Sequence, residues 1–145
     1  LAITAEPEQY IWGNKRDIHF LGWFNNQTML ANELRKSGGV GLLWRDDPMM
    51  MEYMKLNACC KLGTYLSAGL PVIVQSSLPE AEVIRKKNLG ITVDSLDEAV
   101  EKIEHIRPDE YSQMVHDVDR FSYLIRNGYF TKKILIDAVF NLLYD

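Results

Sequence analysis

The sequence predicts an α/β fold, a Rossmann-like doubly wound parallel sheet with a helical C-terminal tail. Short apolar runs of strand length alternate with segments of helical periodicity along the first part of the 145 residues. Strands that alternate with helices pair in parallel and are covered by helices on both faces. Beyond residue 107 the strand pattern stops, and only helical periodicity remains.

We expect four or five strands in this sheet. The runs with strand character are residues 1–4, 18–24, 40–44, 71–74 and 91–93. The segments with helical character lie at about 26–34, 58–68, 79–88, 95–106, 108–125 and 130–143. No repeat or linker interrupts this pattern, so residues 1–145 are expected to form a single domain.

Capping residues mark several helix ends. Asn25 or Asn26 can accept hydrogen bonds from the first amides of the helix that follows. Gly69 can adopt the left-handed conformation that ends a helix. Ser95 and Glu98 have the spacing of a capping box. The helix that this box starts has one apolar face, formed by Leu96, Ala99, Val100, Ile103 and Ile106.

Composition excludes several classes of protein. Hydrophobic residues make up 47% of the chain, enough for a core, and no apolar run approaches the ~20 residues that span a bilayer. The net charge of -4 argues against a nucleic-acid partner, because phosphate backbones favour a basic face. Cys59 and Cys60 are adjacent and offer no ordinary disulfide, which favours a reducing cytoplasm. The chain begins at Leu1, inside a run of strand character, and has no initiator Met. We interpret it as an excised fragment.

The most informative stretch is the helix expected over 58–68 and the strand that follows it. Asn57 is expected to cap this helix, Lys61 to lie one turn later on the same face, and Thr64 to continue that stripe. A cation in the first turn opposes the helix dipole by roughly 0.3 to 1 kcal/mol. An anion at the helix start removes this conflict, since free amides, dipole and ammonium would converge on a diphosphate. The alternative is a solvated lysine on an amphipathic helix.

The chain resembles the C-terminal, donor-binding lobe of GT-B glycosyltransferases. The resemblance rests first on the Asn-x3-Lys-Leu-x2-Tyr-Leu-Ser-Ala-Gly-Leu-Pro-Val-Ile pattern of residues 57–73. Three further runs are similar to accessory glucosyltransferases of Gram-positive bacteria, which add glucose to O-linked N-acetylglucosamine on serine-rich repeat adhesins. These runs are Leu-Gly-Trp-Phe at 21–24, Gly-Val-Gly-Leu-Leu-Trp at 39–44 and Ser-Tyr-Leu-Ile-Arg-Asn-Gly-Tyr-Phe-Thr-Lys-Lys at 122–133.

This resemblance implies a UDP-sugar donor, UDP-glucose in particular. Asn57 and Lys61 would contact the diphosphate, with Thr64 in support. Gly22 and Trp23 lie in the loop after one strand and Trp44 at the end of the next. An aromatic ring there can stack on uracil, and glycine lets the backbone approach the ligand. Core packing is the alternative for both tryptophans.

The loop after the 71–74 strand would lie at the carboxyl edge of the sheet, as would the loops that carry Trp23 and Trp44. Ser76 follows that strand, and its hydroxyl could bind sugar hydroxyls. The neighbouring Ser77 could instead cap the helix that Pro79 opens.

Catalytic residues are not assigned from the sequence. Many retaining GT-B enzymes have two glutamates in this region, but Tyr65 occupies the second of those places and no acid precedes Lys61 in the helix. No metal and no cofactor are expected, since GT-B enzymes generally need no bound metal. Asp46 and Asp47 are interpreted as a solvated turn before Pro48.

Two functional hypotheses follow. The first is an enzyme fragment that binds the UDP-sugar and needs a missing N-terminal lobe to hold the glycoprotein acceptor. The alternative is a non-catalytic nucleotide-sugar-binding or assembly domain. A flavodoxin-like or dinucleotide-binding domain is a weaker third reading, because no G-x-G-x-x-G motif follows any expected strand.

The expected last helix has a long apolar stripe. Its members are Ile134, Leu135, Ala138, Val139, Leu142 and Leu143. In the two-lobed fold the final helix commonly crosses back toward the N-terminal lobe. In this chain we therefore expect the helix either to pack on a second copy, in a homo-oligomer, or to expose apolar surface.

Overall fold

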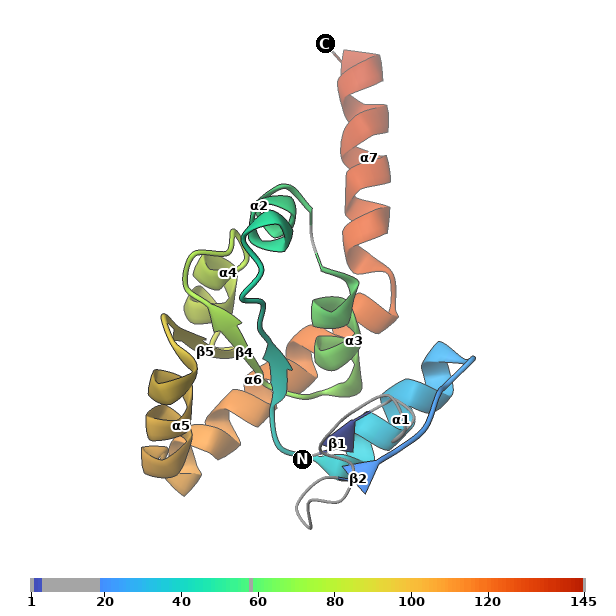
Figure 1. The fold of residues 1–145 in the computed structure, drawn as a ribbon. Coiled ribbons are helices and arrows are strands. Elements are labelled where there is room, and N and C mark those ends of the chain that lie inside the picture. The colour runs from blue at the N-terminus through green and yellow to red at the C-terminus, as the bar shows by residue number, and fades with distance from the viewer. Residues whose placement is uncertain (1, 4–18, 58, 145) are drawn as a thin grey trace.

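The computed structural model describes residues 2–3, 19–57 and 59–144. The strands are β1 (Ala2–Ile3), β2 (His19–Phe20), β3 (Gly41–Leu43), β4 (Val72–Gln75) and β5 (Gly90–Val93). The helices are α1 (Gln27–Ser37), α2 (Pro48–Leu56), α3 (Cys60–Ala68), α4 (Ala81–Lys86), α5 (Leu96–His105), α6 (Pro108–Arg126) and α7 (Tyr129–Tyr144). Figure 1 shows helices around the β3–β5 sheet and α7 projecting away from them.

The strands form two parallel sheets rather than one. β3, β4 and β5 pair in that order, with Leu42 opposite Ile73 and Ile73 opposite Ile91. β1 and β2 pair separately. The strand expected over 18–24 ends early, since Gly22 has a φ of 74°, outside the strand region. The parallel α/β class is thus confirmed, but the expectation of one sheet of four or five strands is wrong for the described residues.

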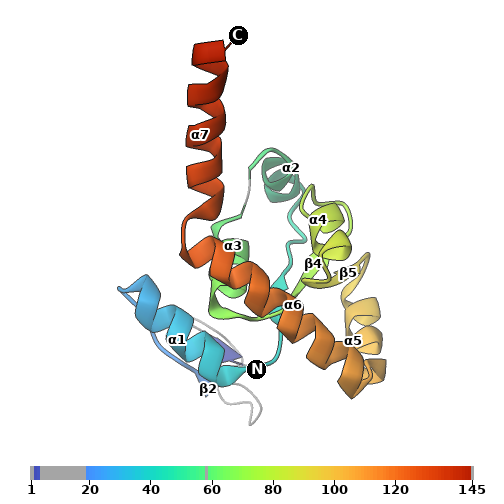
Figure 2. The same ribbon diagram turned by 180° about the vertical axis from the view of Figure 1, so that it is seen from behind.

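Helices cover both faces of the β3–β5 sheet. On one face Val72 and Val74 pack with residues of α3, α4 and α6. The shared core of that face comprises Leu43, Met54, Leu62, Leu66, Val72, Val74, Leu78, Ala81, Ile84, Leu89 and Val118. On the other face Ile73 and Val93 pack with Ala99 of α5. Figure 2 shows α6 crossing in front of the first of these faces.

Several helix ends lie where their capping residues predict. The Asn26 side chain accepts hydrogen bonds from the amides of Thr28 and Met29 at 2.8 and 3.2 Å. Gly69 ends α3 at a φ of 83°. Ser95 caps α5 and accepts from the Glu98 amide at 3.1 Å. The Glu98 carboxylate accepts in return from the backbone before the helix, at 2.6 Å from the amide of Asp94.

Two helices differ from expectation. The methionine-rich stretch after Pro48 forms α2, and the Asp47 side chain accepts from the Met50 amide at 2.8 Å. An aspartate cap followed by proline is a helix-start signal that was available in the sequence. α4 begins at Ala81 rather than at Pro79, so the expectation that Ser77 caps it is wrong.

α7 buries none of its side chains. Leu142 is 85% exposed and Ile134 67%. The base of the helix is held by Phe130, whose ring centroid lies 5.4 Å from that of Phe121. The expectation of exposed apolar surface on the last helix is therefore confirmed. Among the described residues, no helix is both long and apolar enough to cross a membrane.

Candidate functional site

The carboxyl ends of β3, β4 and β5 bring polar residues to one edge of the sheet. Gln75, the last residue of β4, joins this edge to the loop after β3. Its side-chain carbonyl accepts from the Arg45 amide at 3.2 Å, and its amide donates to the Arg45 carbonyl at 2.9 Å. These two bonds continue the β3–β4 pairing beyond the strands and hold Arg45 at the edge.

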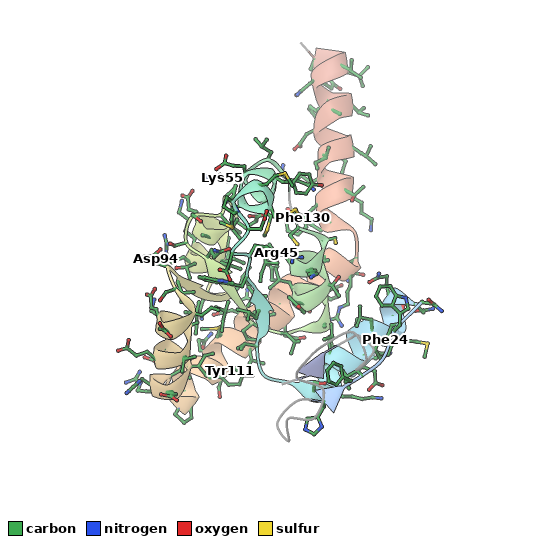
Figure 3. The ribbon with its side chains drawn as sticks, viewed as in Figure 1. Phe24, Arg45, Lys55, Asp94, Tyr111 and Phe130 are labelled. Carbon is green, nitrogen blue, oxygen red and sulfur yellow. The ribbon has the colours of Figure 1, made fainter. Side chains whose placement is uncertain are left out.

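Ser76 pairs with a carboxylate at this edge. Its hydroxyl donates to the carboxylate of Asp94, the residue that follows β5. The Asp94 amide donates to Glu98 at 2.6 Å, and this bond is the main reason that the pKa of Glu98 lies below its ordinary value. Sequence reasoning missed Asp94, although its position directly after a strand was the available signal. Figure 3 shows Asp94 and Arg45 at the same end of the sheet.

Trp44 packs against the core and also makes a hydrogen bond at the carboxyl edge of the sheet. Its ring is half-buried and packs against the Ile73 face of the sheet. Its indole nitrogen donates to the Asp46 carboxylate at 2.5 Å. Asp46, expected only to be solvated in a turn, thus orients the tryptophan.

Gly22 and Trp23 lie apart from this cluster. They follow β2, which belongs to the separate β1–β2 sheet. Trp23 is 75% exposed. Figure 3 shows Phe24, the next residue, beside α1 and well separated from Arg45 and Asp94. The structure therefore does not bring Gly22 and Trp23 together with Ser76 and Trp44.

Lys61 lies in the first turn of α3, as predicted. Its side chain is exposed and makes no ion pair or hydrogen bond with the described residues. The helix start has no side-chain cap. Among the described residues, no acceptor is found for the backbone amides of Cys60 and Lys61, which lie in the first turn beside the ammonium.

The expectation that Asn57 caps this helix is wrong. α2 extends through Leu56, and Asn57 is the C-cap that follows it, in an extended conformation. The Asn57 side-chain amide donates to the Tyr53 hydroxyl at 2.6 Å. Because α3 begins only at Cys60, Asn57 and Lys61 do not share one helix face.

Thr64 is half-buried on α3, one turn beyond Lys61. Its hydroxyl donates to the carbonyl of Cys60 at 3.1 Å, a bond within the helix. The oxygen can still accept a hydrogen bond from a ligand.

A hollow of 840 Å³ opens away from this edge, between α5 and α6. It lies at the amino end of β5 and includes Ile91, Ile106 and Met114. Within the described residues, no three histidine, cysteine or acidic side chains are placed to hold a metal ion.

The fold and its polar edge define a class. Parallel α/β sheets with helices on both faces bind ligands at the carboxyl ends of their strands, where Arg45, Ser76 and Asp94 lie. The chain belongs to the family described as glucosyltransferase 3-like, C-terminal domain, whose model matches residues 1–138. The matched family model describes the C-terminal domain of glucosyltransferase 3-like proteins.

Characterised relatives support the same assignment. Glucosyltransferase 3 of Streptococcus gordonii is 47% identical over 130 residues, which cover 88% of this chain and 38% of the relative. Glucosyltransferase 3 of Streptococcus parasanguinis is 34% identical over 139 residues, 94% of this chain and 41% of the relative. The beta-1,6-galactofuranosyltransferase WbbI of Escherichia coli is 26% identical over 136 residues. The chain spans about two fifths of the length of these relatives.

Proposed function

We propose that this chain binds the UDP-sugar donor of a glycosyltransferase, with UDP-glucose as the sugar nucleotide. The acceptor is an O-linked N-acetylglucosamine on a serine-rich glycoprotein, held by the N-terminal part of the longer protein. The observation that carries the proposal is the position of Lys61 in the first turn of α3, where neither its ammonium nor the first amides of the helix have a partner among the described residues. Homologues named glucosyltransferase support the reaction class.

The diphosphate becomes more negative as the bond to the sugar breaks. Lys61, the first amides of α3 and the positive end of its dipole would stabilise that charge. Arg45 lies at the carboxyl end of β3, the strand that precedes α2 and α3, and would add a second cation. These groups supply positive charge without a metal ion, and we propose none.

The remaining residues would hold the two ends of the donor. The Ser76–Asp94 pair presents one hydroxyl oxygen and one carboxylate to sugar hydroxyls. Trp44, held by Asp46, would stack on uracil. Asn57, Thr64, Gly22 and Trp23 are proposed as further donor contacts. Gly22 and Trp23 reach the ligand only if the β1–β2 sheet lies next to β3.

Calorimetric titration of the chain with four nucleotides tests this proposal. UDP and UDP-glucose should bind, UDP-N-acetylglucosamine more weakly, and NAD not at all. Equal binding of NAD and UDP would favour a dinucleotide domain. Absence of binding by UDP in a folded sample would contradict the proposal.

The second candidate is a non-catalytic nucleotide-sugar-binding or assembly domain that forms a homo-oligomer. The exposed apolar surface of α7 favours this reading, since such surface marks a missing partner. Glucose transfer by the longer protein, lost on substitution of Lys61, would decide for the enzyme. The free thiols of Cys59 and Cys60 fit a reducing compartment, so we propose a cytoplasmic location.

A further inference from the structure

The hollow between α5 and α6 has the size of a ligand site and lies away from the proposed donor site. Its volume is 840 Å³, within the ~300 to 1,000 Å³ typical of small-molecule pockets. It opens at the amino end of β5, whereas Asp94 follows the carboxyl end, roughly 13 Å away along the strand. Figures 1 and 2 both show the end of α5 beside the start of α6. A ligand in the hollow would therefore not compete with one at the carboxyl edge.

The floor of the hollow is apolar. It is formed by Ile91 of β5, Ile106 at the end of α5 and Met114 of α6, of which Met114 is buried. Burial of apolar surface is favourable, so this floor favours a ligand that has carbon–hydrogen surface of its own. A simple inorganic ion has no such surface.

The charges on the rim of the hollow already have partners of opposite sign. Lys102 of α5 pairs with Glu98 at 2.8 Å. Asp109 and Glu110 of α6 both pair with Arg107, each at 3.2 Å. An anionic ligand would meet the two carboxylates, and a cationic ligand would meet the ammonium. The rim therefore favours a neutral ligand.

Two amide side chains on the rim are held in fixed orientations. Asn88 donates to the Asp117 carboxylate at 2.7 Å, and Gln113 donates to both oxygens of the same carboxylate at 3.2 Å. These bonds, led by that from Asn88, are the main reason that the pKa of Asp117 lies below its ordinary value. Among the described residues, no donor reaches the side-chain carbonyl of Asn88 or of Gln113, so both oxygens can accept from a ligand.

His105 and Lys102 add polar groups from α5. Nδ1 of His105 lies 2.8 Å from the Glu101 carbonyl, which can only accept, so the neutral ring carries its proton there and Nε2 is an acceptor. The Lys102 ammonium donates to the Thr92 carbonyl at 3.0 Å and pairs with Glu98, which leaves its third N–H as a donor. Because neighbours already orient these side chains, little further ordering is needed when a ligand binds.

We propose that this hollow binds a neutral sugar ring, a hexose or an N-acetylhexosamine. Such a ring combines a carbon–hydrogen face with hydroxyls around its edge, and each hydroxyl both donates and accepts. The carbon–hydrogen face lies on the apolar floor, and the hydroxyls bind the oriented side chains of Asn88, His105, Gln113 and Lys102. The site lies at the opposite edge of the sheet from the proposed donor site and does not depend on that function.

Nuclear magnetic resonance titration of the isotope-labelled chain tests the proposal. Glucose and N-acetylglucosamine, added separately, should each shift the amide signals of Asn88 and Gln113 in a saturable manner, with saturating UDP present or absent. The sugar with the higher affinity identifies the ring that the hollow prefers. Glucuronate, the anionic analogue of glucose, should bind at least about threefold more weakly, because its carboxylate meets those of the rim.

Matched variants locate the sugar in the hollow. His105→Ala and Gln113→Ala should each weaken binding by about three- to tenfold, the effect of one lost hydrogen bond. Both side chains are exposed, so the thermal midpoint should change little. His116→Ala is the control, since His116 is an exposed histidine of α6 outside the hollow, and its loss should leave the affinity for sugar unchanged.

Three results would overturn the proposal. They are the absence of saturable shifts in the folded chain, shifts that UDP abolishes, and an equal loss of affinity in His116→Ala. Tighter binding of glucuronate than of glucose would exclude a neutral ligand and would also overturn it. Lys61→Ala separates this site from the proposed donor site, because it should weaken binding of UDP and leave the sugar titration unchanged.

Discussion

The ring of Tyr65 lies against the α-carbon of Gly41, at a distance that only glycine allows. A β-carbon at Gly41 would approach Cγ of Tyr65 to 2.5 Å. This contact sets α3 against β3, and Lys61 lies one turn before Tyr65 on the same helix. Burial of the phenol, with a smaller contribution from Cys59, raises the pKa of Tyr65. Tyr65 therefore has a packing role in this chain.

The first prediction concerns this contact. Gly41→Ala should destabilise the protein by about 1 to 3 kcal/mol, because the ring of Tyr65 is in contact on two atoms and must move. Gly63→Ala in α3 is the control. Nothing lies within 4 Å of its added carbon, so alanine should stabilise the helix by up to about 1 kcal/mol. Urea denaturation of both variants measures the difference, and equal effects would show that the contact is not rigid.

The second prediction separates a phosphate-binding lysine from a surface lysine. Lys61→Ala should lower UDP affinity by about ten- to a hundredfold, since it removes a charge-assisted hydrogen bond of roughly 1.5 to 3 kcal/mol. The thermal midpoint without ligand should not fall, because a cation unfavourable to the helix dipole has gone.

The control for this variant is Lys132→Ala. Lys132 also lies in the first turn of a helix, α7, and has no ion pair with the described residues. Its loss should leave UDP affinity unchanged. Unchanged affinity in a folded Lys61→Ala protein would remove the main support for the proposed site.

The third prediction concerns pH. Hydrogen bonds from the Asp94 amide, and then from Lys102, hold the pKa of Glu98 below its ordinary value of 4.5. The stabilisation is therefore fully present above pH 4.5 and is lost as the pH falls below that value through the folded pKa. Glu98→Gln should lower the thermal midpoint at pH 7, and its difference from the wild type should shrink below pH 4.5. Glu104→Gln on the same helix is the control, and a difference independent of pH would contradict the mechanism.

The fourth prediction concerns the exposed helix. A chain ending after Lys133 keeps Phe130 on Phe121 but lacks the apolar part of α7. Its stability should change by less than about 0.5 kcal/mol, because no side chain of α7 is buried. Self-association of the chain should decrease, and so should the binding of an apolar dye. A large fall in the thermal midpoint would show that α7 packs on its own domain.

Local signals in the sequence determined most of the elements. Periodicity and capping residues predict α1, α3, α5 and α6 with the helix ends that Asn26, Gly69 and Ser95 mark. The position of Lys61 in the first turn of α3 could be predicted in the same way. The signals that set the start and the end of this helix all lie close to Lys61 in the sequence. These features depend on neighbours in sequence, so one sequence is sufficient to find them.

Only the tertiary structure decided the rest, because those features depend on residues far apart in the chain. Asp94 became a site residue through Ser76, 18 positions earlier. The division into two sheets and the exposure of Leu42 follow from which strands meet, a choice made by long-range pairing and packing that local patterns do not encode.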